Sequence, residues 1–105
     1  MDEAASADTY TRAMDTEQVR ARAVVKGRVQ MVGFRAFVQR HARGLRGVVR
    51  NRPDGTLETV VEGPKPEVER VIGLLRRGPS AARVDRVDVE YLPPTGDLPP
   101  MTVSA

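Results

Sequence analysis

Residues 45–62, LRGVVRNRPDGTLETVVE, predict two neighbouring strands joined by a tight turn. Apolar residues lie on both sides of Pro53-Asp54-Gly55, in which Asp and Gly tolerate the positive φ that hairpin turns need. We expect strands over residues 45–52 and 56–62. The second alternates two sets of side chains: Leu57, Thr59 and Val61 against Glu58, Val60 and Glu62. A β-hairpin therefore forms the middle of the expected fold.

A strand and a helix are expected before this hairpin. Residues 19–26, VRARAVVK, alternate apolar and basic side chains, as a half-buried strand does, and we expect Gly27 to end it. Helical spacing then begins, with a stripe formed by Phe34, Phe37, Val38, His41 and Leu45. We expect Arg40 and Arg43 in the last turn of this helix and Gly44 as its cap.

A second helix and a further strand are expected after the hairpin. Pro66 suits a first helical position, and Gly78-Pro79 stops the helix. Its apolar stripe is Val68, Val71, Ile72 and Leu75. Residues 83–92 alternate again, but the phase slips near Asp85-Arg86, which predicts a bulge. Residues 101–104 are expected to form a short edge strand.

The order of these elements is β-α-β-β-α-β. This order is typical of the ferredoxin-like α+β fold, an antiparallel sheet with both helices on one face. Many functions occur on this fold, so the function has to be argued from a site.

Charge is unevenly distributed along the 105 residues. The chain has 17 basic and 14 acidic residues, and residues 1–18 hold five of the acids and one of the bases. Residues 19–105 therefore carry 16 bases and 9 acids, a net charge of +7. We expect a disordered acidic tail over residues 1–18 and one domain over residues 19–105. The tail lacks the features of a secretory signal, and we expect a cytoplasmic, monomeric protein.

The composition excludes several kinds of site. The chain has no Cys and one His, so it has no disulfide, thiolate metal site, cysteine nucleophile or histidine pair. No apolar run approaches the length of a membrane span. Four aromatic residues are too few for most stacking platforms that bind single-stranded nucleic acid. The basic domain still indicates a phosphate-bearing partner.

Residues 27–35, GRVQMVGFR, join the first expected strand to the first helix. Gly27 and Gly33 bracket this loop, and a helix N-terminus follows, where unpaired N–H groups and the helix dipole attract anions. Arg35 lies in the first helical turn, and its guanidinium matches phosphate oxygens. No Gly-Lys-Ser/Thr follows, which excludes a nucleotide P-loop. From its residues alone, the loop is either an anion site or a β–α turn with a solvated arginine.

Asn51 is the only asparagine in the chain, and it lies at the end of the first hairpin strand. It is either a turn former beside Pro53-Asp54-Gly55 or a polar group that reaches the loop at residues 27–35.

Three segments together resemble the acylphosphatase family: GRVQMVGFR at 27–35, RGVVRNRPDGTLETVVEG at 46–63 and GPSAARV at 78–84. The resemblance covers about residues 19–92. Its specific parts are a VQxVxFR loop and a VRN tripeptide ahead of a D-G hairpin.

The resemblance implies hydrolysis of acyl phosphates to a carboxylate and inorganic phosphate, with no metal or other cofactor. It implies that Arg35 binds the phosphate and that Asn51 holds the attacking water. The implied backbone cradle for the phosphate is Arg28, Val29, Gln30, Met31, Val32 and Gly33. The implied partner is a small acyl phosphate, and neither a membrane nor nucleic acid is expected.

Three features depart from the family pattern. Met31 stands where Gly is usual, and a positive φ there costs a non-glycine residue about 1–2 kcal/mol. Val48 stands where Trp is usual. The stretch at residues 42–47 is about two residues shorter than usual, which shortens the first helix and is expected to affect the position of Asn51 relative to Arg35.

Two other functions on the same fold stay open. One is a phosphate- or anion-binding module without catalysis, in which Met31 closes the site. The other is an RNA-binding module that uses the +7 domain. The arginines do not favour RNA binding because they are spread over several elements, and the sheet lacks an aromatic pair on which bases stack.

Overall fold

A computed structural model describes residues 17–104 of the chain. Its elements are β1 (Gln18–Arg28), α2 (Phe34–His41), β2 (Arg46–Asn51), β3 (Leu57–Pro64), α3 (Lys65–Arg77), β4 (Arg83–Leu92) and β5 (Thr102–Val103). The expected acidic tail lies outside the described residues except at Glu17 and Gln18, of which Gln18 opens β1. No helix within residues 17–104 is long and apolar enough to cross a membrane.

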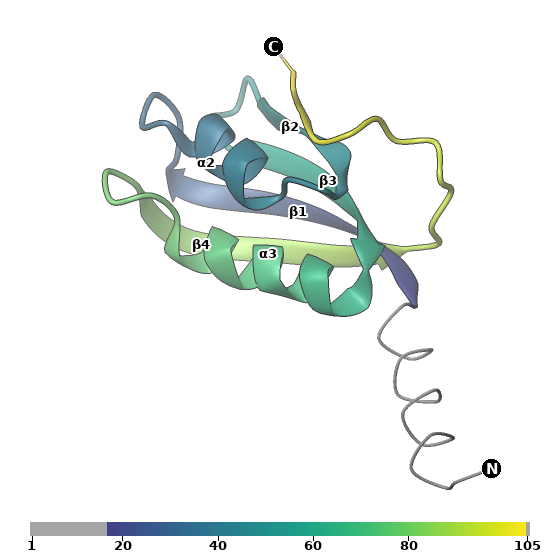
Figure 1. Cartoon of the computed structure of the whole chain (residues 1–105). Coiled ribbons are helices and arrows are strands. Elements are labelled where there is room, and N and C mark those ends of the chain that lie inside the picture. The colour runs from purple at the N-terminus through teal and green to yellow at the C-terminus, as the bar shows by residue number, and fades with distance from the viewer. Residues whose placement is uncertain (1–16, 105) are drawn as a thin grey trace, which may run out of the picture.

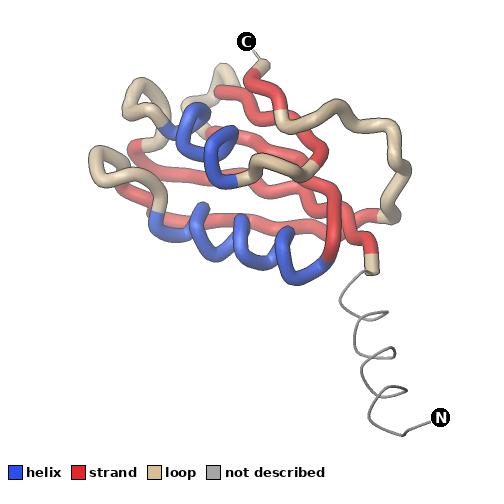
Figure 2. Tube along the Cα trace, in the orientation of Figure 1, coloured by secondary structure: helices blue, strands red, loops and turns tan. Residues whose placement is uncertain are grey.

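The strands form one sheet in the order β4-β1-β3-β2-β5. Every pair among β4, β1, β3 and β2 is antiparallel, whereas β5 pairs with β2 in parallel. Both helices lie on the same face of this sheet (Figures 1 and 2). The ferredoxin-like α+β fold is therefore confirmed, with the short edge strand β5 as its one parallel member.

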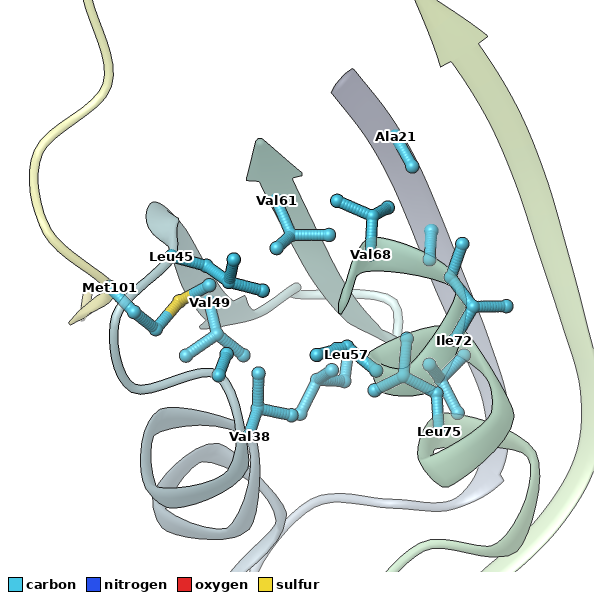
Figure 3. Packing of buried hydrophobic residues seen from close by; sticks show 14 of the residues in the cluster. Ala21, Val38, Leu45, Val49, Leu57, Val61, Val68, Ile72, Leu75 and Met101 are labelled. Atoms are coloured by element: carbon cyan, nitrogen blue, oxygen red, sulfur yellow. The ribbon is translucent and has the colours of Figure 1, made fainter. Parts of the chain in front are cut away.

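The core lies between the helices and the sheet. Figure 3 shows α3 side chains, among them Val68, Ile72 and Leu75, facing the strand residues Leu57 and Val61. Met101, which precedes β5, reaches in beside Leu45 and Val49 from the opposite side (Figure 3). Burial of these side chains stabilises each element by about 1.5–3 kcal/mol per residue. Of the two alternating sets of side chains on β3, Leu57, Thr59 and Val61 form the fully buried one.

The predicted bulge lies in β4. Lys26 pairs with Arg86 while Gly27 pairs with Val84, so Asp85 is the extra residue. The expectation that Gly27 ends the first strand is wrong, because the bulge lets pairing continue to Arg28. A Cβ on Gly27 would lie 2.2 Å from the carbonyl oxygen of Arg83, so only glycine fits there.

Helix α2 ends earlier than the sequence predicts. It stops at His41, and Gly44, with φ 90°, lies in the following turn rather than at the cap. Leu45 is buried as expected, but it reaches the core from this turn, where its N–H donates to the carbonyl of Ala42. Arg43 therefore lies beyond the helix.

The sheet face opposite the helices carries two buried carboxylates. Glu58 accepts hydrogen bonds from Arg22 of β1 (2.6 Å) and Arg50 of β2 (2.8 Å). Glu62 accepts the backbone N–H groups of Thr95 (3.1 Å) and Gly96 (2.7 Å). Glu62 thereby fixes the segment of residues 93–101 that runs from the end of β4 to β5 (Figure 1). The path of this segment decides where β5 lies.

Candidate active site

A pocket of about 250 Å³ lies where the loop after β1, the start of α2, the end of β2 and β5 meet. Its lining residues are Val29, Met31, Gly33, Phe34, Arg35, Ala36, Asn51 and Val103. The two side chains singled out in the sequence, Arg35 and Asn51, thus line one cavity although they are 16 positions apart in the sequence.

The loop brings unpaired backbone donors to this pocket. Gly33 caps α2 with φ 79°, and its carbonyl accepts the N–H of Phe37. Within residues 17–104, the N–H groups from Met31 to Ala36 have no hydrogen-bond partner, and the first turn of α2 holds no acid. These donors and the positive end of the helix dipole favour an anion.

Arg35 adds a full positive charge to the same end of α2. Its side chain is half-buried, and its Nη1 lies 3.5 Å from the carbonyl oxygen of Ser104. That contact is long for a hydrogen bond and uses one of the five guanidinium donors. The remaining donors have no partner within the described part of the chain, so they are free to bind an anion in the pocket.

Asn51 approaches the pocket from the last position of β2. Its Oδ1 is buried and has no hydrogen-bond partner among residues 17–104. A buried amide oxygen without a partner is costly, so such a group points to a ligand or a bound water. The short stretch at residues 42–47 does not separate Asn51 from Arg35, because both line the same cavity.

Met31 adopts the backbone conformation that the resemblance suggested for it. Its φ is 61°, and it is the only non-glycine residue with positive φ among residues 17–104. Its side chain is 100% exposed. Met31 therefore lines the pocket without covering it, and the strained backbone is the only cost of this departure.

The other cradle residues divide between the pocket and its surroundings. Val29 is fully buried and lines the pocket, whereas Val32 packs against the core. Arg28 is the last residue of β1, where it pairs with Arg83, and it does not line the pocket. Gln30 does not line it either, but its side chain links the loop to the hairpin.

Gln30 was expected to contribute to the site through its backbone, but in the structure its side chain has a role as well. Its Nε2 donates to the carbonyls of Arg52 (2.7 Å) and Thr56 (2.9 Å) at the two ends of the β2–β3 turn. Asp54 supports the same turn by accepting hydrogen bonds from the Thr56 hydroxyl and N–H, which lower the pKa of Asp54. Gln30 thus holds the loop against the hairpin that carries Asn51.

Three lining residues, Phe34, Ala36 and Val103, are missing from the sequence-based set of site residues, although Phe34 was expected in the apolar stripe of the helix. Ala36 has no chemical feature that marks it. Val103 belongs to β5, whose position beside β2 depends on the long connection after β4. His41, which the sequence places in the apolar stripe of this helix, is half-buried, and its ring lies against that of Phe37 at a tilt of 56° with 4.5 Å between the centroids.

Known proteins are similar to this chain in sequence and in fold. The family model described as acylphosphatase matches residues 21–99. A protein named acylphosphatase from Caldivirga maquilingensis is 57% identical over 75 residues, which cover 69% of this chain and 79% of that protein. One from Thermococcus kodakarensis is 50% identical over 82 residues, covering 76% and 90% of the respective chains.

The structural comparison agrees with the sequence comparison. The crystal structure of an acylphosphatase from Bacillus subtilis has a TM-score of 0.79 and 32% sequence identity, and the match covers 83% of this chain and 99% of that one. The family model spans three quarters of the chain, including the loop, Arg35 and Asn51. The resemblance seen in the sequence is therefore confirmed, and the chain belongs to the acylphosphatase family.

Proposed function

We propose that this chain hydrolyses acyl phosphates in the pocket between the loop at residues 27–35 and the end of β2. Membership of the acylphosphatase family gives the reaction class: a carboxylate and inorganic phosphate are formed from an acyl phosphate and water. The observation that carries the assignment to this pocket is that Arg35, Asn51 and four residues with unpaired N–H groups line one cavity; the four are Met31, Gly33, Phe34 and Ala36.

Arg35 and the loop bind the phosphoryl group of the substrate. Phosphoryl transfer needs mainly positioning and stabilisation of charge on the phosphoryl oxygens. The guanidinium and the N–H groups of Met31, Val32 and Gly33 supply both. The side chain of Met31 is fully exposed and leaves room for the substrate, which removes the reason to prefer a non-catalytic anion-binding module.

Asn51 orients the attacking water. Its buried Oδ1 accepts a hydrogen bond from the water, whose oxygen forms a new bond to phosphorus as the bond from phosphorus to the acyl oxygen breaks. Asn does not titrate near neutral pH, so a phosphoryl oxygen of the substrate takes the proton. The leaving carboxylate belongs to an acid with a pKa of about 4, so it departs without a general acid.

Benzoyl phosphate tests this proposal directly. The folded protein should accelerate the loss of benzoyl phosphate in a buffer that contains a chelator, and inorganic phosphate should inhibit competitively because it occupies the same cradle. Folded protein that leaves benzoyl phosphate decaying at its background rate would contradict the proposal.

Three further expectations stay predictions: a cytoplasmic location, a monomer, and no binding of nucleic acid. Light scattering on a sizing column tests the second. Affinity for single-stranded RNA that survives physiological salt would contradict the third.

A further inference from the structure

A second and larger cavity adjoins the phosphate pocket. It measures about 410 Å³ and lies between the outer face of α2 and the segment that leads into β5. We call it the basic groove; its lining residues are Ala36, Gln39, Arg40, Arg43, Gly44, Pro100 and Met101. Ala36 also lines the phosphate pocket, so the two cavities adjoin each other at this residue.

The same two walls continue from one cavity into the other. On the helix side, Ala36, Gln39 and Arg40 follow the i, i+3, i+4 spacing that puts residues on one helical face, and Arg43 lines the groove from the turn beyond α2. On the opposite side, Pro100 and Met101 line the groove, and Val103 lines the pocket. Met101 fixes this wall, because its side chain is buried beside Leu45 and Val49 (Figure 3).

The charge of the groove is uncompensated. Arg40 and Arg43 are exposed, and neither side chain has a hydrogen-bond or ion-pair partner within residues 17–104. No lining residue is acidic. The arginines on the open face of the sheet differ, because Arg20, Arg22 and Arg50 are each paired with carboxylates. The groove thus offers two free guanidinium groups and the amide of Gln39 to an anion.

The distance from the phosphate pocket suits a single small substrate. Ala36 lines both cavities, and Arg40 lies on the same helical face four residues after it, about 6 Å along the helix axis. A phosphoryl group bound at Arg35 therefore leaves the acyl part of the same molecule within reach of Arg40 and Arg43.

We propose that the basic groove binds an anionic group on the acyl part of the substrate, so that the enzyme prefers acyl phosphates carrying a second negative charge, such as a carboxylate. This inference rests on the proposed function, because it takes the phosphoryl group to lie at Arg35. Arg40 and Arg43 contact the distal anion and act on specificity, while the chemistry stays at the phosphate pocket.

Phosphonate analogues test the groove without relying on turnover, because their carbon–phosphorus bond resists hydrolysis. The probes are benzoylphosphonate, 4-carboxybenzoylphosphonate and 4-carbamoylbenzoylphosphonate, whose para group is neutral, with affinities measured by calorimetry. The wild-type protein should bind the carboxylate analogue about fivefold more tightly than benzoylphosphonate, as expected for exposed ion pairs. The carbamoyl analogue should show no such gain.

Two double variants show where the gain arises. Arg40→Gln/Arg43→Gln should remove the preference for the carboxylate and leave the affinity for benzoylphosphonate unchanged. Lys65→Gln/Arg77→Gln removes the same charge from α3 at positions that line neither cavity, and it should keep the preference. If this control also loses the preference for the carboxylate analogue, the preference arises from the overall charge of the protein, and the groove proposal is overturned.

The remaining outcomes separate the groove from the phosphate pocket. Wild-type protein that binds benzoylphosphonate and hydrolyses benzoyl phosphate, but shows no preference for the carboxylate, would overturn the groove proposal alone. A preference that persists in Arg40→Gln/Arg43→Gln would do the same. Wild-type protein that neither binds benzoylphosphonate nor hydrolyses benzoyl phosphate would overturn the proposed function and the groove with it.

Discussion

Among single residues, Met31 shows most clearly how a substitution can strain the backbone and still leave a site open. Its φ of 61° belongs to the left-handed region, where a side chain is unfavourable. Its side chain is fully exposed and therefore gains nothing from packing. The cost of Met31 falls on stability rather than on access to the pocket.

Replacement of Met31 by Gly should therefore stabilise the fold. The relief of strain, about 1–2 kcal/mol, exceeds the entropic cost of a new glycine, about 0.5–1 kcal/mol, so the free energy of unfolding should rise by about 0.5–1 kcal/mol. Urea denaturation measures this change, and benzoyl phosphate turnover should stay within about twofold.

Gly44→Ala is the matched control for Met31→Gly. Gly44 has φ 90° and open space around its Cα, so alanine there should be strained without a clash and should destabilise the fold by about 1 kcal/mol. A destabilised Met31→Gly variant would contradict this explanation.

Single residues also show what a sequence reveals about a site. The types and positions of Arg35 and Asn51 make them candidates, because a guanidinium at a helix start and a lone amide at a strand end are visible in the sequence. Each also allowed an ordinary structural interpretation, and the resemblance to the acylphosphatase motifs decided between the two. The side chain of Gln30 is different, because its two acceptors are backbone carbonyls that come together only in the folded hairpin.

Among elements, the loop after β1 and the β2–β3 hairpin act as one unit because Gln30 joins them. Gln30→Ala would leave the carbonyls of Arg52 and Thr56 without this donor, at a cost of about 1–3 kcal/mol in the free energy of unfolding. The loop would also lose its fixed distance from Asn51, so we expect kcat with benzoyl phosphate to fall about tenfold or more.

Gln39→Ala is the control for Gln30→Ala. Gln39 is exposed on α2, and its side chain has no hydrogen-bond partner within residues 17–104. Benzoyl phosphate carries no second anion for the basic groove, so removal of this amide should change neither the free energy of unfolding nor kcat for benzoyl phosphate. Equal effects of the two variants would show that the link from loop to hairpin has no special role.

Features of a helix or strand could be predicted where they change the pattern of its own sequence, and not where they depend on how the folded chain buries a residue. The bulge at Asp85 was predictable because it shifts the phase of alternation in β4 itself. The end of α2 was not, because Leu45 continues the helical spacing while it is buried from a turn. Periodicity reports that a residue is buried, and it does not report which backbone conformation buries it.

For the whole molecule, Glu58 links three strands through one carboxylate. It lies on β3 and accepts hydrogen bonds from Arg22 of β1 and Arg50 of β2. Burial alone would raise the pKa of Glu58, but these hydrogen bonds outweigh it and hold the pKa below its usual value of 4.5. The folded state therefore gains stability from ionised Glu58 above pH 4.5 and loses it as the pH falls through the lower, folded-state pKa.

Glu58→Gln should reveal this dependence. At pH 7 the variant should lose about 1–3 kcal/mol in the free energy of unfolding, because two charge-assisted hydrogen bonds are weakened. The difference from the wild type should shrink below pH 4.5, where the wild-type carboxylate takes up a proton. Denaturant unfolding from pH 7 to pH 3 measures it, with exposed Glu69→Gln as the control, and a difference that does not depend on pH would contradict the account.

The position of β5 is the feature of the whole molecule that the sequence predicted least well. An edge strand near residues 101–104 was expected, but its parallel pairing with β2 follows from the path of residues 93–101, which Glu62 fixes from the far face of the sheet. That path brings Val103 to the phosphate pocket and forms one wall of the basic groove.

The central claim is that Arg35 binds the phosphoryl group and Asn51 orients the attacking water in the same pocket. One paired measurement tests it: kcat for benzoyl phosphate together with the calorimetric affinity for inorganic phosphate. Arg35→Gln should lose phosphate binding and turnover together. Asn51→Ala should lower kcat by about 100-fold or more, as the loss of a positioning group does, and bind phosphate within a few-fold of the wild type. Asn51→Ala that keeps its turnover, or Arg35→Gln that keeps its phosphate affinity, would contradict the claim.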